Sequence, residues 1–289
     1  TFWIENMKKN KIYLVSLIAI GCLTAAGCGI GKFTASGSDS ASLGNIDPLL
    51  KYAWHIENYG QTVFAQQPAV AGFDLNLAAT WTEQIYGNGV MVQISDDGLE
   101  DTHPDLSGNF SYTNQSKNYT TAAPYTSNTS GPIMSDDNHG TCVAGLVAAV
   151  GWNGIGSRGV APKAKLTIVN FLSSAVNITN ALKLDQTQGT FDISNMSWGT
   201  TQDTIYTLSP AYNTQVKSMI TSGRNGKGTI FVKSAGNDFA VECNGMTGTY
   251  CIGNSNFDTD NALPYIITVG ALNAQGESSS YSSTGSNLW

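Results

Sequence analysis

Residues 90–98 read Val-Met-Val-Gln-Ile-Ser-Asp-Asp-Gly, a nearly continuous apolar run that ends in two carboxylates and a glycine. Such a run is typical of a β-strand buried on both faces, and strands of this kind occur in parallel sheets. Further short β-rich runs follow along the chain: Leu166–Phe171, Asp192–Ser197, Thr229–Ser234 and Ile266–Gly270. The sequence therefore predicts that these runs pair in a parallel sheet.

Helical segments are predicted between the strands. Leu75–Tyr86 precedes the first strand, Gly140–Val150 follows His139, and Thr204–Ser222 precedes the fourth strand. Strands that alternate with helices indicate an α/β fold with a doubly wound, mostly parallel sheet and helices on both faces.

Composition narrows the class of protein. The chain has 289 residues, of which 41% are hydrophobic and 12% charged, so it suits one large domain or two small ones. Few charges and many polar loop residues are typical of an exported protein. The net charge of −7 argues against nucleic acid as a partner, because phosphate binding needs basic patches.

The first 28 residues have the features of an export signal. Met7 is the expected initiator, and residues 1–6 are interpreted as upstream sequence. Lysines at positions 8, 9 and 11 precede the apolar run Ile12–Leu23, which is too short to span a bilayer comfortably. Residues 1–28 are therefore interpreted as upstream sequence plus a signal peptide, outside the folded domain.

Small residues lead to Cys28, and this ending resembles a bacterial lipobox. We expect lipidation at Cys28, with Cys22 as a weaker acceptor; the alternative is an ordinary signal peptide cleaved nearby. The Gly/Ser-rich residues 29–44 are predicted to form a tether. The protein is thus expected in the cell envelope, anchored to a membrane only through lipid, or secreted.

Three cysteines remain in the mature part. Cys243 and Cys251 flank a Gly/Thr-rich loop and could close it as a disulfide in an oxidising compartment. Cys142 lies in an apolar helical segment and is expected to be a buried free thiol.

Polar residues that can carry chemistry follow strands or begin a helix. Asp96 comes directly after the first strand, His139 begins a predicted helix, and Asn237 follows the fourth strand. In open α/β sheets, ligands collect at the carboxyl ends of strands. Each residue alone has an ordinary alternative: an Asx turn, a capping histidine and a turn asparagine.

Together, the order of Asp96, His139 and Asn237 resembles the subtilase family. Two neighbouring motifs also resemble it, Gly159-Val160-Ala161-Pro162 and Ser194-Asn195-Met196-Ser197-Trp198-Gly199. The resemblance implies a subtilisin-like peptidase domain over residues 45–289. It also implies that Asp96 is the triad aspartate, His139 the general base and Asn237 the oxyanion donor.

The family's nucleophilic serine lies in Gly-Thr-Ser-x-Ala-x-Pro, and this sequence has no such motif. We therefore expect that the domain is incomplete at its C-terminus and that this chain is inactive alone. An inactive, subtilase-like surface protein is the alternative from a different functional class.

Asp96-Asp97-Gly98 and Asp136-Asp137-Asn138-His139 resemble the kexin/furin branch of the family. That resemblance implies a preference for paired basic residues before the scissile bond, with a broad degradative subtilase as the alternative. The residues that it assigns to substrate binding are Asp97 and Asp136 in the S2 pocket, Asp258 in the S1 pocket, and Ser197, Trp198 and Gly199. Solvated loop carboxylates are the ordinary alternative for the acidic members.

The resemblance also implies a structural calcium ion near the loop 150–157. Calcium takes oxygen ligands from carboxylates, amides and backbone carbonyls. The expected ligands are the side chains of Asp47, Asp105 and Asn153 and the carbonyls of Val150, Ile155 and Ser157. An ordinary Asn-Gly turn is the alternative.

Polypeptide substrates are the expected partners. The tether after Cys28 is too short for the family's usual folding prodomain, so a separate chaperone, or folding without one, is a hypothesis. The kexin branch also carries a C-terminal P domain, which would lie beyond this sequence.

Overall fold

The computed structural model describes residues 47–65, 67–111, 116–120, 123, 125–127, 131, 137–173, 175–200, 205, 207–242 and 248–288. The expected signal peptide with Cys22 and Cys28, the tether, Asp136 and Cys243 lie outside these residues. Within them, no helix combines the length and apolar character needed to cross a bilayer.

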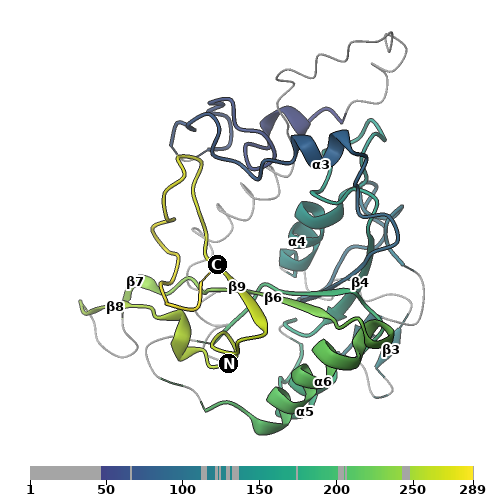
Figure 1. Cartoon of the computed structure of the whole chain (residues 1–289), viewed down its shortest axis with the longest axis vertical. Coiled ribbons are helices and arrows are strands. Elements are labelled where there is room, and N and C mark those ends of the chain that lie inside the picture. Colours follow the sequence, from purple (N-terminus) through teal and green to yellow (C-terminus); the bar gives the residue numbers. More distant parts are fainter. Residues whose placement is uncertain are drawn as a thin grey trace.

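A seven-stranded sheet forms the centre of the molecule, with strand order β3-β2-β4-β1-β5-β6-β9 (Figure 1). Its strands are β1 (Met91–Asp96), β2 (Ser116–Asn118), β3 (Thr126–Ser127), β4 (Lys165–Asn170), β5 (Ile193–Met196), β6 (Ile230–Ser234) and β9 (Ile266–Val269). All neighbours pair in parallel except β2 and β3. The predicted parallel sheet and α/β fold are confirmed.

The central strand, β1, lies between β4 and β5. The strands β4, β2 and β3 lie on one side of it, and β5, β6 and β9 lie on the other. Five of its six residues are buried, as expected for a strand covered on both faces. Asp96 pairs with Asn170 of β4, and Ser95 pairs with Met196 of β5, so the carboxyl ends of three strands meet beside Asp96. After β4 the chain crosses to the other side of β1, so this edge is a topological switch point. Open α/β sheets form their ligand sites at such points.

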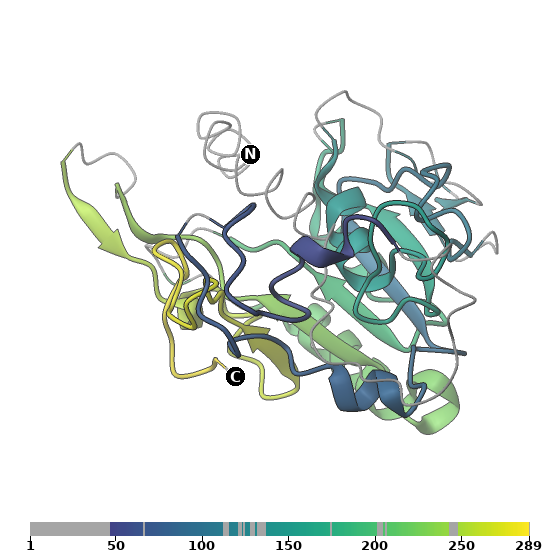
Figure 2. The same ribbon diagram turned by 90° about the horizontal axis from the view of Figure 1, so that it is seen from above.

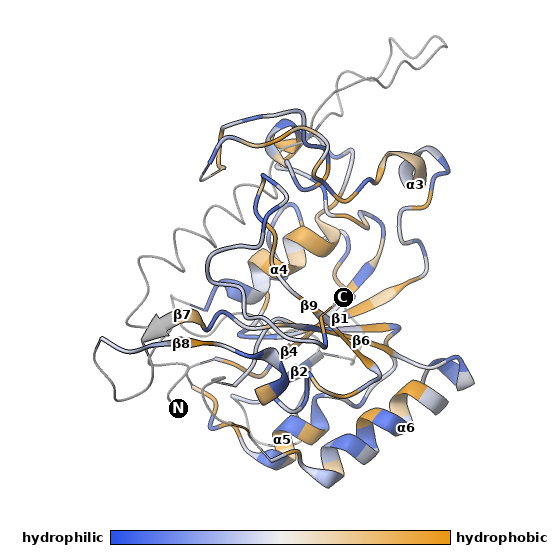
Figure 3. Ribbon diagram, turned by 60° about the vertical axis from the view of Figure 1, so that its left-hand side comes forward, coloured by the Kyte–Doolittle hydropathy of each residue, from blue (hydrophilic) through white to orange (hydrophobic). Residues whose placement is uncertain are grey.

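Helices cover both faces of the sheet (Figure 1). Helix α4 (His139–Ala148) lies on one face, and α5 (Asn180–Asp185) and α6 (Pro210–Gly226) lie on the other. Figure 3 shows apolar residues on α4 and the central strands, whereas α6 carries both polar and apolar residues.

Two helices have different ends in the structure from those that the sequence predicts. The structure limits 75–86 to α3 (Ala78–Thr82), because Asn76 and Gln84 have positive φ angles of 53° and 60°. Helix α6 begins at Pro210, because proline fits the first helical position and the Ser209 hydroxyl accepts a hydrogen bond from the Tyr212 N–H. Its regular backbone ends before Gly223.

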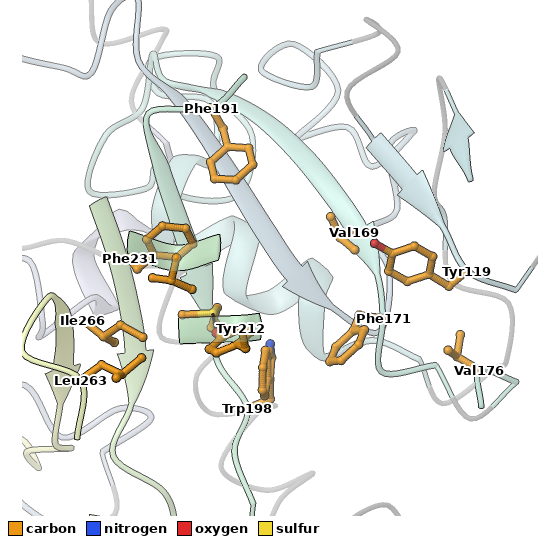
Figure 4. Close-up of a cluster of buried hydrophobic side chains, with 12 residues drawn as sticks. Tyr119, Val169, Phe171, Val176, Phe191, Trp198, Tyr212, Phe231, Leu263 and Ile266 are labelled. Atoms are coloured by element: carbon orange, nitrogen blue, oxygen red, sulfur yellow. Dashed lines mark hydrogen bonds between the residues drawn. The ribbon is translucent and has the colours of Figure 1, made fainter. Parts of the chain in front are cut away.

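Each face of the sheet has its own core. The core under α6 is rich in aromatic residues, among them Phe171, Trp198, Tyr212 and Phe231 (Figure 4). The core under α4 is aliphatic and includes Ile94, Leu166, Ala144 and Ala148. The alanines of α4 let that helix approach the strands closely, which places its first residue near the end of β1.

A two-stranded hairpin, β7 (Phe239–Glu242) and β8 (Tyr250–Ile252), extends from the body of the molecule (Figure 2). Two short 3-10 helices, η2 (Leu50–Tyr52) and η3 (Ser255–Phe257), precede β1 and β9 respectively.

The expectation of a buried free thiol at Cys142 is wrong. Cys142 lies in α4, is only partly buried, and is disulfide-bonded. An apolar sequence context indicates burial but does not reveal whether a second cysteine lies within bonding distance, which depends on the fold. The pairing predicted for Cys243 and Cys251 stays a prediction, because Cys243 and the side chain of Cys251 are not among the described parts.

Candidate active site

The structure brings Asp96 and His139 together at the carboxyl edge of the sheet. Asp96 is the last residue of β1 and is fully buried, and His139 is the first residue of α4. The Asp96 Oδ1 lies 2.7 Å from His139 Nδ1. The histidine side chain is 23% exposed, so the carboxylate orients a ring that still reaches the surface. Because Nδ1 faces Asp96, Nε2 is the ring nitrogen left to exchange protons with a substrate.

Asp97 fixes the start of α4. Its Oδ2 accepts a hydrogen bond from the His139 N–H at 3.1 Å, and its Oδ1 accepts one from the Gly140 N–H at 2.7 Å. Asn138 occupies the N-cap position but makes no side-chain cap bond, so the capping carboxylate comes from the strand end instead. Sequence reasoning placed Asp97 in a substrate pocket and missed this role.

Burial and neighbouring charges shift the pKa values of Asp97 and His139. Desolvation and the charge of Asp96 raise the pKa of Asp97 to about 7, against the hydrogen bond from Gly140. Burial lowers the pKa of His139, but the charge and hydrogen bond of Asp96, with the charge of Asp97, raise it overall. The site therefore stabilises an imidazolium, the form that a general base takes after it accepts a proton.

Asn237 lies three residues beyond the end of β6, on the same edge of the sheet. The Ser283 N–H donates to the Gly236 carbonyl at 3.0 Å, and the Asp238 N–H donates to Ser283 Oγ at 3.0 Å. These bonds on either side of Asn237 hold its loop, and the side chain itself is partly buried.

The segment after β5 carries Ser197, Trp198 and Gly199. Trp198 is buried in the aromatic core, and Asn195 Nδ2 donates to Ser197 Oγ at 2.9 Å. Gly199 lies against Asp258, because a Cβ placed on it would be 3.0 Å from Asp258 Oδ2.

Asp258 carries a charge that another side chain already neutralises. Its Oδ2 lies 2.6 Å from Lys233 Nζ and accepts a hydrogen bond from the Thr200 N–H at 3.1 Å. Burial raises the pKa of Asp258, but the charge and hydrogen bond of Lys233 lower it overall, so the carboxylate is ionised and paired. Sequence reasoning missed Lys233, which looks like an ordinary strand residue.

The residues expected to hold calcium meet around one loop. Asp47 Oδ1 accepts from the Asn153 N–H at 3.1 Å, and Asp105 Oδ1 accepts from Asn153 Nδ2 at 2.8 Å. Asp105 Oδ2 also accepts from the Ser157 N–H at 3.0 Å. Arg158 Nε lies 2.7 Å from Asp47 Oδ2.

Val150 and Ile155 belong to the same loop: the Val150 N–H donates to the Asp105 carbonyl, and the Ile155 N–H donates to Asn153 Oδ1. Within the described ranges, no group of three or more His, Cys, Asp or Glu side chains could hold a metal ion. Asp47 and Asp105 bring two carboxylates to this loop, and its amide and carbonyl oxygens are available for the remaining positions.

Comparison with known proteins gives the same family throughout. The profile of the subtilase family matches residues 87–289. The extracellular serine protease of Aeromonas sobria is 32% identical over 289 residues, which covers 93% of this chain and 44% of that protein. The dibasic-processing endoprotease of Schizosaccharomyces pombe is 34% identical over 251 residues, covering 84% of this chain and 31% of that protein.

Solved structures agree. The serine protease of Aeromonas sobria superposes with a TM-score of 0.75 at 31% identity, covering 91% of this chain and 46% of that one. The complex of that protease with the chaperone ORF2 superposes with a TM-score of 0.72 at 32% identity, covering 82% and 41%. The chain thus spans less than half the length of these relatives.

Proposed function

The chain belongs to the subtilase family, and on this premise we propose that the whole protein is a serine endopeptidase. The observation that carries the proposal is the contact of 2.7 Å between Asp96 and His139 at the carboxyl edge of the sheet. A buried carboxylate that holds one imidazole nitrogen leaves the other free to act as a general base.

In the proposed mechanism, His139 Nε2 takes the proton of a serine hydroxyl while the serine oxygen attacks the peptide carbonyl carbon. Asp96 fixes the ring and stabilises the imidazolium that forms. The Asn237 amide donates a hydrogen bond to the carbonyl oxygen as it becomes an oxyanion. The imidazolium then protonates the leaving amine, and water releases the acyl group from the serine by the same proton relay.

The proposal requires a nucleophilic serine, and no serine of the present sequence lies in a Gly-Thr-Ser-x-Ala-x-Pro motif. Reading the gene beyond the codon for Trp289 tests this requirement. Hydrolysis by the whole gene product, abolished in His139→Ala by about 10⁶-fold in kcat as is known for subtilisin, would support the proposal. A complete gene without that motif would favour the inactive surface protein.

For specificity, we propose a broad endopeptidase in preference to a dibasic one. Relatives include a dibasic-processing endoprotease, which supports basic sites. In this chain, however, both carboxylate oxygens of Asp97 accept hydrogen bonds from the first N–H groups of α4, and Asp258 forms an ion pair with Lys233. Both oxygens of Asp97 are thus engaged by backbone N–H groups and the charge of Asp258 is already paired, so neither carboxylate is open to a substrate lysine or arginine.

A panel of quenched peptides that differ only in the residue before the scissile bond tests the specificity. We expect cleavage after leucine or phenylalanine that is equal to or better than cleavage after lysine or arginine. A strong preference for Lys-Arg or Arg-Arg would restore the dibasic alternative.

We also propose that a structural calcium ion is held by Asp47, Asp105, Asn153 and the carbonyls of the loop 150–157. The pKa of Asp105 is raised overall. Desolvation and the charge of Asp47 raise it, and hydrogen bonds from Asn153 and Ser157 offset part of that effect. A cation between these two carboxylates would relieve their repulsion, and all the expected donors are oxygens. The competing cation is Arg158, which already contacts Asp47.

EDTA tests the calcium proposal without any measurement of activity. We expect chelation to lower the melting temperature of the whole protein by several degrees and added calcium, but not magnesium, to restore it. An unchanged melting temperature would leave Arg158 as the only cation at Asp47.

Export and a folding chaperone are proposals for the whole protein. They are supported by a relative named as extracellular and by a structural neighbour crystallised with a chaperone. Lipidation at Cys28 and a C-terminal P domain are proposed on the sequence resemblance alone. Expression of the full gene with and without neighbouring genes, and with Cys28→Ser, tests folding and anchoring separately.

A further inference from the structure

Lys233 is a charged residue in a place where charge is costly. It is the fourth residue of β6, and its side chain is 0% exposed. Its partner, Asp258, has a side chain that is 3% exposed. A buried ion pair gains little over apolar residues of the same size, whereas one buried charge without its partner costs several kcal/mol. Each member of this pair therefore determines what the other can bind.

The pair lies beside the proposed active site. Lys233 precedes Asn237 by four residues, and the buried carboxylate of Asp258 lies against Gly199, three residues beyond the end of β5. A Cβ on Gly199 would be 3.0 Å from Asp258 Oδ2 and 3.5 Å from Lys233 Nζ. Because Gly199 has no side chain, a substrate side chain that passes it would face both charges at once.

A second pair repeats the pattern nearby. Lys183 Nζ contacts Asp260, and the ammonium groups of Lys183 and Lys233 lie 5.8 and 5.1 Å from the ring centroid of Trp198. Two acidic residues of the 258–260 segment are thus each matched by an internal lysine. The charges of these two lysines and two aspartates therefore balance.

We propose that Lys233 is a specificity-determining residue, which neutralises Asp258 and makes the position beside Gly199 select uncharged substrate side chains. The inference rests on the proposed endopeptidase function and names its substrate class. A substrate lysine or arginine at this position would meet the ammonium group of Lys233 and would have to compete with it for Asp258. Like charges placed side by side at an interface cost several kcal/mol.

The test uses the whole protein and two peptides that differ only in the residue before the scissile bond, arginine or leucine. The quantity measured is the ratio of kcat/KM for the arginine peptide to kcat/KM for the leucine peptide. Both rates come from one preparation, so the ratio does not depend on the fraction of folded enzyme. We expect the wild-type ratio to be below about 0.1.

Lys233→Met leaves Asp258 as an unpaired carboxylate, and we expect it to raise the ratio at least about tenfold. Asp258→Asn leaves the lysine charge instead, and we expect it to lower the ratio further. Lys183→Met is the comparison: Lys183 contacts Asp260 and acts on Asp258 only through its charge, so its ratio should rise by less than that of Lys233→Met. Loss of packing alone would lower both rates and would not move the two variants in opposite directions.

The outcomes separate the two proposals. A wild-type enzyme that prefers arginine, or a ratio that is unchanged in both Lys233→Met and Asp258→Asn, overturns the inference and leaves the endopeptidase proposal intact. A complete protein that cleaves no peptide of the panel contradicts the proposed function, and the inference then falls with it.

Discussion

At the scale of the residue, two adjacent carboxylates have different tasks. Asp96 binds the imidazole of His139, while Asp97 binds the backbone that carries that imidazole. Both charges favour the protonated ring, but only Asp96 sets its orientation. Because the two carboxylates are buried side by side, desolvation and the charge of Asp96 raise the pKa of Asp97 to about 7. The charge of Asp97 therefore changes within the pH range in which such an enzyme works.

Asp97→Asn should move the acid limb of the pH profile of kcat/KM to lower pH. Removing a negative charge lowers the pKa of His139, so the neutral, basic form of the ring persists to lower pH. Asp97 is charged mainly above about pH 7, so the shift should appear above that pH. The profile of the whole protein is the measurement.

Asp96→Asn is the comparison for that experiment. It should lower kcat by about 10⁴-fold, the loss known for the equivalent change in trypsin, because the ring loses its orienting carboxylate. An Asp97→Asn profile that superposes on wild type would show that Asp97 acts on the backbone alone.

At the scale of the element, the junction of β1 and α4 builds the site. The end of the strand and the start of the helix approach so closely that a Cβ on Gly140 would lie 2.2 Å from the Gly98 carbonyl oxygen and 2.8 Å from Asp96 Cβ. Only glycine permits this approach. The contact between Asp96 and His139 is therefore a consequence of how these two elements pack.

Gly140→Ala should separate α4 from β1, destabilise the protein by about 1–3 kcal/mol and abolish hydrolysis. Gly145→Ala is the matched control on the same helix, where a Cβ would meet nothing within 4 Å. There alanine should stabilise the protein by about 0.5–1 kcal/mol, because it favours the helix and restricts the unfolded chain. Urea unfolding of both variants is the measurement, and equal effects would contradict the close packing inferred at Gly140.

The five strands of the main parallel sheet could be predicted to within one or two residues, because each is a short β-rich run with a turn after it. The strands β2, β3 and β8 have only two or three residues, too few to give such a pattern, and β7 pairs only with β8, outside the main sheet. The meeting of Asp96 and His139 could be predicted only through the resemblance to the subtilase family, because His139 begins a helix and its distance from the end of β1 depends on packing. The partners Lys233 and Arg158 could not, because a charge pair between distant segments leaves no trace in spacing.

At the scale of the whole molecule, the segment before β1 joins parts that are far apart in sequence. The Leu49 N–H donates to the Gly156 carbonyl, and the Val70 N–H donates to the carbonyl of Ala274. Asn58 Nδ2 donates to that same carbonyl at 2.9 Å. In Figure 1 the segment runs along one side of the molecule, where the loop near residue 274 reaches it. It thus ties the loop after α4 to the region after β9.

The buried pair of Asp47 and Arg158 also belongs to this tie. Besides Arg158, Asp47 accepts hydrogen bonds from the backbone of residues 152–154, and the guanidinium carbon of Arg158 lies 4.3 Å from the ring centroid of Trp152. The side chains of Asp47 and Arg158 are 0% and 9% exposed. Removal of either partner leaves the other as an unpaired charge that is largely shielded from water.

Asp47→Asn and Arg158→Met should therefore each lower the free energy of unfolding of the whole protein by about 3–5 kcal/mol. The double variant should cost less than the sum, by about 0.5–3 kcal/mol, because neither charge is then left alone. If calcium also binds Asp47, EDTA will shrink the loss caused by Asp47→Asn and enlarge the loss caused by Arg158→Met, because Asp47 then has neither cation. Urea unfolding followed by tryptophan fluorescence, with and without EDTA, measures all four proteins. Strictly additive losses would mean that the two side chains stabilise the fold independently and would contradict the inferred coupling between them.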